Sequence, residues 1–300
     1  MGNLELTKKK DVSSFRKIAI GTWQTAYDPQ VYGTMDLRME EALRYLAAFR
    51  AHTGRRATIS HMVAKAVAAA LVEMPDANAV LRWNRIYVRK TIGVFFQVVM
   101  EDEGPGKVDL SGATLYDVEK KSLAEICDEF QAKVDLVRQR KDKALEKTRN
   151  SFKKVPYWFL NRLLKIMSFL NGTLNLKLPG VPKDPFGSIM VTNIGTLGLD
   201  VAYVPLVPYS RVPLLLAVGA VKDVPVVDGG AVVPGKVMRI SATFDHRIID
   251  GFHAAVMSRV LRKWLEKPFE HFDKLDGAPL ALPPGPAPAD AAVAKPAAKP

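Results

Sequence analysis

The chain has 300 residues, of which 48% are hydrophobic, so it can bury a substantial core and is not a mainly disordered polypeptide. Its single cysteine excludes a disulfide framework within the chain and any zinc or iron–sulfur site built from several cysteines. The net charge of +12 fits three classes of partner, namely nucleic acid, an anionic membrane surface or a phosphate-bearing small molecule.

The two ends of the chain differ in composition. The first residues contain no apolar signal-peptide core, and no run of about 18 uncharged apolar residues could cross a membrane, so we expect a cytoplasmic protein. Residues 1–11 are interpreted as an N-terminal arm. Residues 277–300 contain nine Ala and seven Pro, which predicts a disordered tail that is either inert or a tether for another protein.

Apolar spacing predicts the elements between these ends. In chain order, we expect a helix over 38–50, an Ala-rich helix from Thr58 to Pro75, strands over 85–89 and 91–100, a basic helix over 123–150, strands over 187–193, 214–220 and 237–245, and a helix over 251–266. The sequence Asp228-Gly229-Gly230 predicts a hairpin turn between the last two strands. Because helices and strands interleave without a strict βαβ rhythm, we expect an α/β protein of the α+β type, a mixed sheet covered by helices.

The segment Thr243-Phe244-Asp245-His246-Arg247-Ile248-Ile249-Asp250-Gly251 carries the most chemistry. It brings a histidine to the end of a predicted strand, where backbone contacts can hold one tautomer and leave the other ring nitrogen as a base. Asp250 either caps the helix that follows or pairs with a distant arginine. Gly251 permits a tight turn. The alternative interpretation is a structural histidine with no chemical role.

This segment resembles the His-x-x-x-Asp-Gly signature of the chloramphenicol acetyltransferase-like superfamily. The form Asp-His-Arg-x-x-Asp-Gly is most similar to the catalytic domain of the 2-oxoacid dehydrogenase dihydrolipoamide acyltransferases. Three other segments resemble the family in order and spacing: Arg16-Lys17-Ile18-Ala19, Val191-Thr192-Asn193-Ile194-Gly195 and Leu216-Ala217-Val218-Gly219-Ala220. The resemblance covers about residues 12–276 and implies one catalytic domain with a chloramphenicol acetyltransferase-like fold.

The resemblance implies an acyltransferase that moves an acyl group between a thioester carrier and an acceptor thiol or hydroxyl. His246 is then the general base and Thr192 the hydroxyl that stabilises the oxyanion. Asp250 completes this catalytic set by fixing the loop. Arg16 is the expected partner of Asp250, and Gly251 is expected to support the turn.

Coenzyme A is the implied carrier, with no metal and no covalent acyl-enzyme; a nucleophilic role for Cys127 is not expected. Because the chain begins almost at the catalytic core, a lipoyl group is expected only on a separate carrier protein. The family forms trimers with the active site between subunits, so we expect a homotrimer or a larger homo-oligomer. The alternative function is a catalytically silent trimeric scaffold of a multienzyme complex. Binding to nucleic acid is not expected, since charge alone supports it.

One segment departs from the family, an apparent insertion over about 150–183. It contains a short apolar stretch edged with Lys and Arg, and it follows a strongly basic helix. Residues 133–183 hold thirteen basic and three acidic side chains, most of the net charge of the chain. Three interpretations remain open: a helix packed on the protein or its trimer, a cover over a hydrophobic acyl site, or peripheral membrane contact through residues 153–176. We expect a hydrophobic acyl or acceptor group rather than acetyl.

Overall fold

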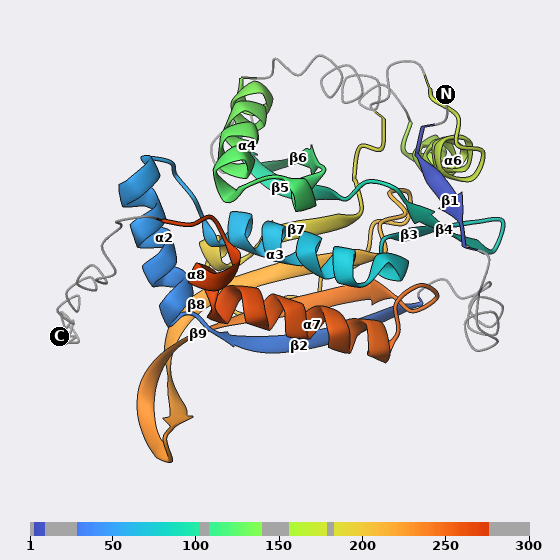
Figure 1. Ribbon diagram of the computed structural model, residues 1–300. Helices are drawn as coiled ribbons and strands as arrows, with labels where there is room; N and C mark the ends of the chain where they lie inside the picture. Colours follow the sequence, from blue (N-terminus) through green and yellow to red (C-terminus); the bar gives the residue numbers. More distant parts are fainter. Residues whose placement is uncertain (1–2, 10–28, 102–107, 140–155, 179–182, 276–300) are drawn as a thin grey trace, which may run out of the picture.

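The computed structural model describes residues 3–9, 29–101, 108–139, 156–178 and 183–275. Their centre is a six-stranded mixed sheet in the order β2-β9-β8-β7-β5-β6 (Figure 1). β7 pairs in parallel with both β5 and β8, while the other neighbours are antiparallel. The strands are β2 (Gln30–Arg38), β5 (Gly93–Glu101), β6 (Val108–Tyr116), β7 (Ile189–Asn193), β8 (Leu214–Asp228) and β9 (Ala231–Asp245).

A second, three-stranded sheet lies at one end of the molecule, in the order β1-β4-β3. Its strands are β1 (Leu6–Lys8), β3 (Ala79–Arg82) and β4 (Arg85–Arg89). Part of the predicted N-terminal arm is therefore a strand, since β1 pairs antiparallel with β4. The predicted tail over 277–300 lies outside the described residues.

Helices cover one face of the large sheet, and the main hydrophobic core lies between the two layers (Figure 1). The principal helices are α2 (Glu40–Thr53), α3 (Ile59–Glu73), α4 (Leu123–Arg138) and α7 (Gly251–Glu266), and α8 (Pro268–His271) follows α7. Short helical turns are η1 (Pro75–Ala77), η2 (Val118–Lys120) and η4 (Gly195–Leu197). α3 is rich in alanine, and its small side chains let it pack closely against both the sheet and α7. The predicted mixed sheet covered by helices is confirmed.

The opposite face of the sheet carries a smaller apolar cluster around Met190, Val212 and Leu215. Successive side chains of β7 point to opposite faces of the sheet. Val191 belongs to the main core and Met190 to the smaller cluster, so Thr192 lies on the face away from the covering helices.

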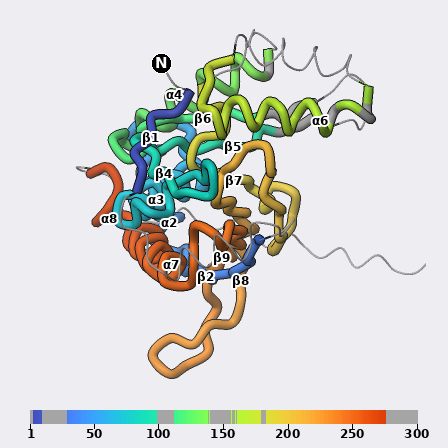
Figure 2. Tube along the Cα trace, turned by 90° about the vertical axis from the view of Figure 1, so that its right-hand side faces the viewer, coloured from blue at the N-terminus to red at the C-terminus, as the bar shows by residue number. Residues whose placement is uncertain are grey.

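Several predicted boundaries agree with the structure. β4 and α7 have the predicted limits, and β8 and β9 are joined by the predicted turn, in which Gly229 and Gly230 have φ of 55° and 84°. Both values lie in the left-handed region that glycine tolerates. β8 and β9 run beyond the predicted ranges and form a hairpin that projects from the sheet (Figure 2).

Other predictions were incomplete. β2, β3 and β6 were not predicted; in β2, polar residues alternate with apolar ones, and β3 has only four residues. Val260 and Leu261 of α7 are buried, whereas the apolar side chain of Phe252 is 68% exposed. It follows Gly251 at the start of α7, where the helix has not yet reached the core.

The apparent insertion contains α6 (Tyr157–Ser168) and the π-helical turn η3 (Phe169–Thr173). Two arginines hold this unit to the rest of the molecule. Arg82 Nε donates to the Thr173 carbonyl at 2.9 Å. Arg211 Nε donates to Ser168 Oγ at 2.9 Å, and its Nη1 donates to the Leu81 carbonyl at 3.3 Å. α6 is thus anchored to β3 and to the loop before β8. Within the described ranges, no helix is long and apolar enough to span a membrane.

Candidate active site

His246 lies in the loop between β9 and α7, and main-chain hydrogen bonds fix both sides of it. The Asp245 N–H donates to the Pro213 carbonyl at 2.9 Å, and the His246 N–H donates to the Pro29 carbonyl at 3.0 Å. The N–H groups of Ile248 and Ile249 both donate to the Asp245 carbonyl. The loop is therefore a tight turn joined to the segments that lead into β2 and β8.

The imidazole of His246 is oriented by its own loop. Nδ1 lies 3.0 Å from the Ile249 carbonyl oxygen, which can only accept a hydrogen bond. This contact favours the neutral tautomer with the proton on Nδ1, so that the lone pair is on Nε2. A base with this orientation is what the sequence predicts for a histidine at a strand end.

Asp245 and Arg247 flank the histidine and form an ion pair with each other. The separation of Arg247 Nη2 and Asp245 Oδ2 is 2.6 Å, and Arg247 Nε lies 2.9 Å from Asp245 Oδ1. The Arg247 N–H also donates to the same carboxylate at 3.0 Å. Sequence analysis assigned these residues no role, although the Asp-His-Arg order was visible. Their pairing stabilises the turn that carries His246.

Asp250 caps α7. Its carboxylate accepts from the His253 N–H at 3.1 Å and lies 2.6 Å from His253 Nδ1. Of the two predicted roles, capping is therefore present, while Arg16, the predicted partner, lies outside the described residues. The turn role predicted for Gly251 is not supported, because its φ is not positive and an added Cβ would meet no described atom within 4 Å.

Thr192 lies near the end of β7. It is paired with Ala217 of β8, which in turn is paired with Ser241 of β9. The following residue, Asn193, fixes this strand end: its Nδ2 donates to Ser60 Oγ at 2.9 Å, and its Oδ1 accepts from the Thr196 N–H at 3.2 Å. The start of α3 therefore supports the position of Thr192.

One subunit does not bring Thr192 and His246 together. Thr192 is two strands away from β9 and level with Ser241, whereas His246 follows five residues later. With about 4.8 Å between strands and about 3.3 Å per residue, the two residues are separated by roughly 15–20 Å. The described subunit therefore holds the two predicted site residues far apart.

The remaining candidate groups have structural roles. Cys127 is buried in α4, and burial raises the pKa of its thiol to about 12, which disfavours the nucleophilic thiolate. His61 is buried in α3, and burial lowers its pKa to about 4. No cluster of three or more His, Cys, Asp or Glu suited to a metal ion occurs within the described ranges.

A cavity of about 240 Å³ lies between α7 and strands β2, β8 and β9. The residues that line it are mostly apolar, and Ile249 is among them. The residue whose carbonyl orients His246 therefore also borders the cavity. The lining residues are Gly33, Thr34, Met35, Leu214, Leu216, Ile240, Ala242, Phe244, Ile249, Ala254, Ala255, Met257, Ser258 and Leu261.

This fold and the histidine loop define a known class of protein. The family of the 2-oxoacid dehydrogenases acyltransferase (catalytic domain) matches residues 5–153 and 185–272. Because that match covers well over half of the chain, the protein belongs to this family. Residues 154–184, which include α6 and η3, lie outside the match.

Individual relatives agree with the family assignment. The chain is 23% identical over 215 residues to the dihydrolipoyllysine-residue acetyltransferase component of the acetoin cleaving system of Bacillus subtilis, covering 72% of this chain and 43% of the relative. It is 36% identical over 81 residues to the lipoamide acyltransferase component of the branched-chain alpha-keto acid dehydrogenase complex of Pseudomonas putida, covering 27% of this chain and 19% of the relative. The matches thus span less than half the length of these curated relatives.

Solved structures share the fold. A probable dihydrolipoamide acetyltransferase of Listeria monocytogenes superposes with a TM-score of 0.59 and 17% identity, covering 92% of this chain and 99% of the other. The dihydrolipoamide acetyltransferase of Azotobacter vinelandii gives a TM-score of 0.60 and 20% identity, covering 88% of this chain and 93% of the other.

Proposed function

We propose that this protein transfers an acyl group between a thioester carrier and an acceptor thiol or hydroxyl. The observation that carries this proposal is the orientation of His246 by the Ile249 carbonyl, within a segment that the acyltransferase family matches. Coenzyme A, or a lipoyl group on another protein, would supply the thioester.

His246 Nε2 takes the proton of the attacking thiol or hydroxyl and returns it to the leaving thiolate, a role worth about 10²–10⁴ in rate. The Thr192 hydroxyl donates a hydrogen bond to the oxyanion of the tetrahedral intermediate. Asp245, Arg247 and Asp250 hold the turn that carries the base. The acyl group passes directly from donor to acceptor, and the buried, protonated thiol of Cys127 supports the absence of an acyl-enzyme on that residue.

The active site requires a second subunit. The separation of Thr192 from His246 within one chain supports a site in which one subunit provides the base and its neighbour the hydroxyl, as in a cyclic homotrimer. In the Azotobacter enzyme a serine, a histidine and an asparagine take part in the catalytic mechanism. We propose Thr192, His246 and Asp250 for the hydroxyl, the base and the fourth residue after the base in this chain.

The transferred group is expected to be hydrophobic. The apolar cavity beside Ile249 supports this, because an aliphatic acyl chain that enters it leaves water while its thioester stays near the His246 loop. Replacing Ala255 on the cavity wall by Phe should reduce activity with long acyl chains more than with acetyl. Equal activity of the native protein with every chain length would contradict a hydrophobic acyl site.

The test is release of free coenzyme A, separated by chromatography together with the acylated acceptor, from a panel of acyl-coenzyme A donors, from acetyl to long-chain, with dihydrolipoamide and simple thiols as acceptors. His246→Ala should lower the rate at least a hundredfold. The matched control, His52→Ala, removes an exposed histidine of α2 and should retain the native rate. Absence of release with every donor and acceptor would instead favour the catalytically silent scaffold.

A further inference from the structure

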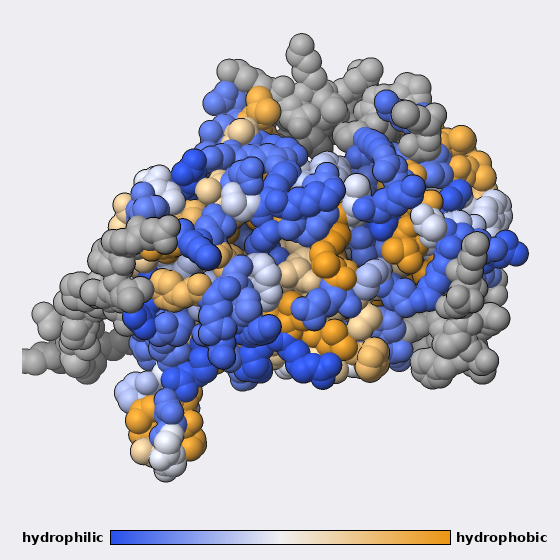
Figure 3. All heavy atoms as spheres, viewed as in Figure 1, coloured by the Kyte–Doolittle hydropathy of each residue, from blue (hydrophilic) through white to orange (hydrophobic). Residues whose placement is uncertain are grey.

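The unit formed by α6, η3, the residues that follow η3 and the β3–β4 turn exposes several large apolar side chains, and we call five of them the α6 patch. They are Trp83, Ile166, Phe169, Leu174 and Leu176, with exposed fractions of 61%, 50%, 42%, 38% and 48%. The rings of Trp83 and Phe169 meet edge to face with centroids 5.8 Å apart, so the patch joins segments far apart in sequence. Figure 3 shows hydrophobic surface at this end of the molecule.

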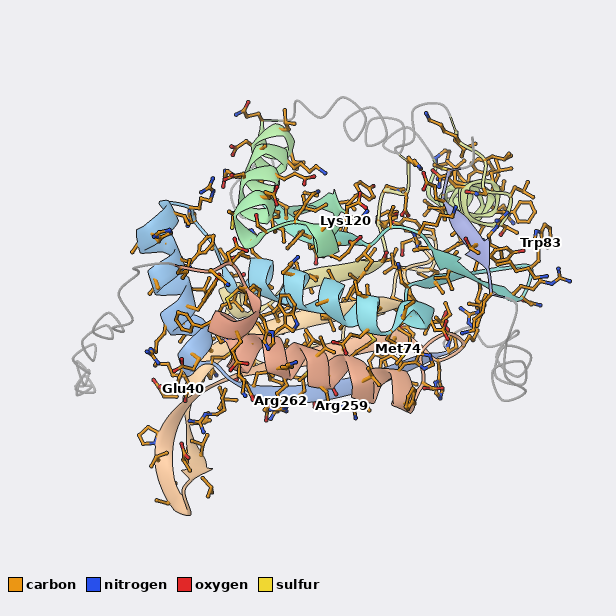
Figure 4. All side chains as sticks on the ribbon, viewed as in Figure 1. Glu40, Met74, Trp83, Lys120, Arg259 and Arg262 are labelled. Atoms are coloured by element: carbon orange, nitrogen blue, oxygen red, sulfur yellow. The ribbon has the colours of Figure 1, made fainter. Side chains whose placement is uncertain are left out.

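Trp83 is held in an unusual conformation at the tip of the patch. It and Asn84 form the turn between β3 and β4, with φ of 50° and 56°. A two-residue turn of this kind normally uses Asn or Gly at both positions, and a bulky residue with positive φ is strained. The turn makes Trp83 project from the end of the molecule (Figure 4). A strained residue that exposes an indole to solvent indicates a functional contact.

The patch is rigid, because buried contacts hold it from behind. Arg211 bonds to Ser168 at the end of α6 and to the Leu81 carbonyl beside the Trp83 turn. Arg211 also packs on Gly172, where an added Cβ would lie 2.5 Å from its side chain. The backbone that carries the patch is therefore tied to β3 and to the loop before β8.

The segments that form the patch carry charge of one sign. Residues 156–178 and 79–89 contain no Asp or Glu. Lys165 and Lys177 are exposed beside the apolar side chains, and neither forms an ion pair with any residue that the structure describes. The patch therefore combines aromatic and aliphatic groups with uncompensated lysines.

We propose that the α6 patch docks on the surface of an anionic phospholipid bilayer. At such a surface, aromatic and aliphatic side chains enter the boundary between headgroups and acyl chains while lysines remain at the phosphates. The long lysine stems permit both contacts at once. α6 has only twelve residues, so it lies along the surface and does not cross it.

Two other occupants fit this surface less well. A two-fold contact with a second copy would bring the same patch to both sides, and the lysines of the two copies would then face each other. The core of a protein–protein interface is depleted in lysine, whereas here the lysines lie among the apolar groups. An anionic bilayer satisfies both kinds of side chain.

The experiment is flotation of the full chain with vesicles of phosphatidylglycerol and phosphatidylcholine in equal parts, compared with vesicles of phosphatidylcholine alone. The native protein should bind only the anionic vesicles, and binding should weaken when salt is raised tenfold from about 0.05 M. Ile166→Glu combined with Phe169→Glu, and separately Lys165→Glu combined with Lys177→Glu, should each reduce the bound fraction at least tenfold. These side chains are exposed, and circular dichroism checks that the variants remain folded.

Val227→Glu combined with Val232→Glu is the matched control. Both valines are 72% exposed but lie in the β8–β9 hairpin, outside the α6 patch, so vesicle binding should stay within twofold of native.

Light scattering measures the oligomeric mass of every variant in parallel. The proposal is overturned if the native protein binds neutral and anionic vesicles equally or not at all. It is also overturned if the patch variants change the oligomeric mass, which would identify the patch as an interface between copies. Neither readout uses acyl transfer, so this test is independent of the proposed activity.

Discussion

The loop of His246 and the strand end of Thr192 are the two halves of the proposed site, and they are built differently. The His246 loop is fixed mainly by contacts close in sequence, namely the Ile249 carbonyl, the Asp245–Arg247 pair and the Asp250 cap, and is joined to distant segments only through the main-chain bonds to Pro29 and Pro213. The Thr192 end depends on a contact distant in sequence, from Asn193 to Ser60 at the start of α3. Each half is ordered within one subunit, yet the sheet keeps them roughly 15–20 Å apart. In the proposed site, local contacts orient the base, whereas a second subunit would bring the hydroxyl to it.

The largest expected effect is on the hydroxyl half-site. Thr192→Val keeps the shape of the side chain but removes the donor to the oxyanion, so kcat should fall by about 10²–10³ with little change in KM. Steady-state kinetics with the best acyl-coenzyme A donor measures this. Thr196→Val, in the exposed turn after β7, serves as the control. A native kcat for Thr192→Val would show that the two halves do not act in one site.

Mixing two inactive variants tests directly whether His246 and Thr192 act together from different subunits. Co-assembly of His246→Ala with Thr192→Val in equal amounts should restore activity to about a quarter of native, because one interface in four then combines an intact histidine with an intact threonine. A site within one subunit would stay inactive in every mixture. Each variant refolded alone provides the baseline.

Acid should destabilise the fold at α3, because this helix contains the buried His61. Ser60, the neighbour of His61, holds the strand end of Thr192 through Asn193. Burial lowers the pKa of folded His61 to about 4, while the unfolded chain titrates near 6.5. The unfolded state therefore binds the extra proton, and the free energy of unfolding falls by up to about 3 kcal/mol as the pH drops from 6.5 to 4. Urea unfolding at several pH values should show this slope in the native protein. It should be reduced in His61→Asn and unchanged in His52→Asn; an equal slope in all three would refute this origin.

The smallest effect concerns the cap of α7. Asp250→Ala removes the acceptor of the His253 N–H and should lower the free energy of unfolding by about 1 kcal/mol. Asp250→Asn keeps a capping oxygen and should remain within a few tenths of native. Thermal unfolding measures both, and equal losses would show that the charge of Asp250, rather than its cap, stabilises the loop. Activity of the Asn variant then reports whether that charge also matters to His246.

Much of the fold was visible in the sequence where local patterns are strong. The limits of α7 and β4, the β8–β9 turn and the family signature around His246 follow from apolar periodicity, glycine pairs and residue spacing within short windows. β2 was missed because pairing with β9, which is distant in sequence, stabilises it more than its own residues do. The roles of Asp245 and Arg247 could have been suspected from their positions on either side of His246.

The sequence by itself determined the family, the proposal of His246 as the base and the concentration of positive charge between residues 133 and 183. Only the tertiary structure decided where these features lie relative to one another. Strand order separates Thr192 from His246, and burial makes Cys127 unreactive. Contacts between distant segments join Trp83 to Phe169 in one exposed surface. The physical reason is that a chain's local pattern fixes its elements, whereas the register and packing of elements distant in sequence fix which side chains meet.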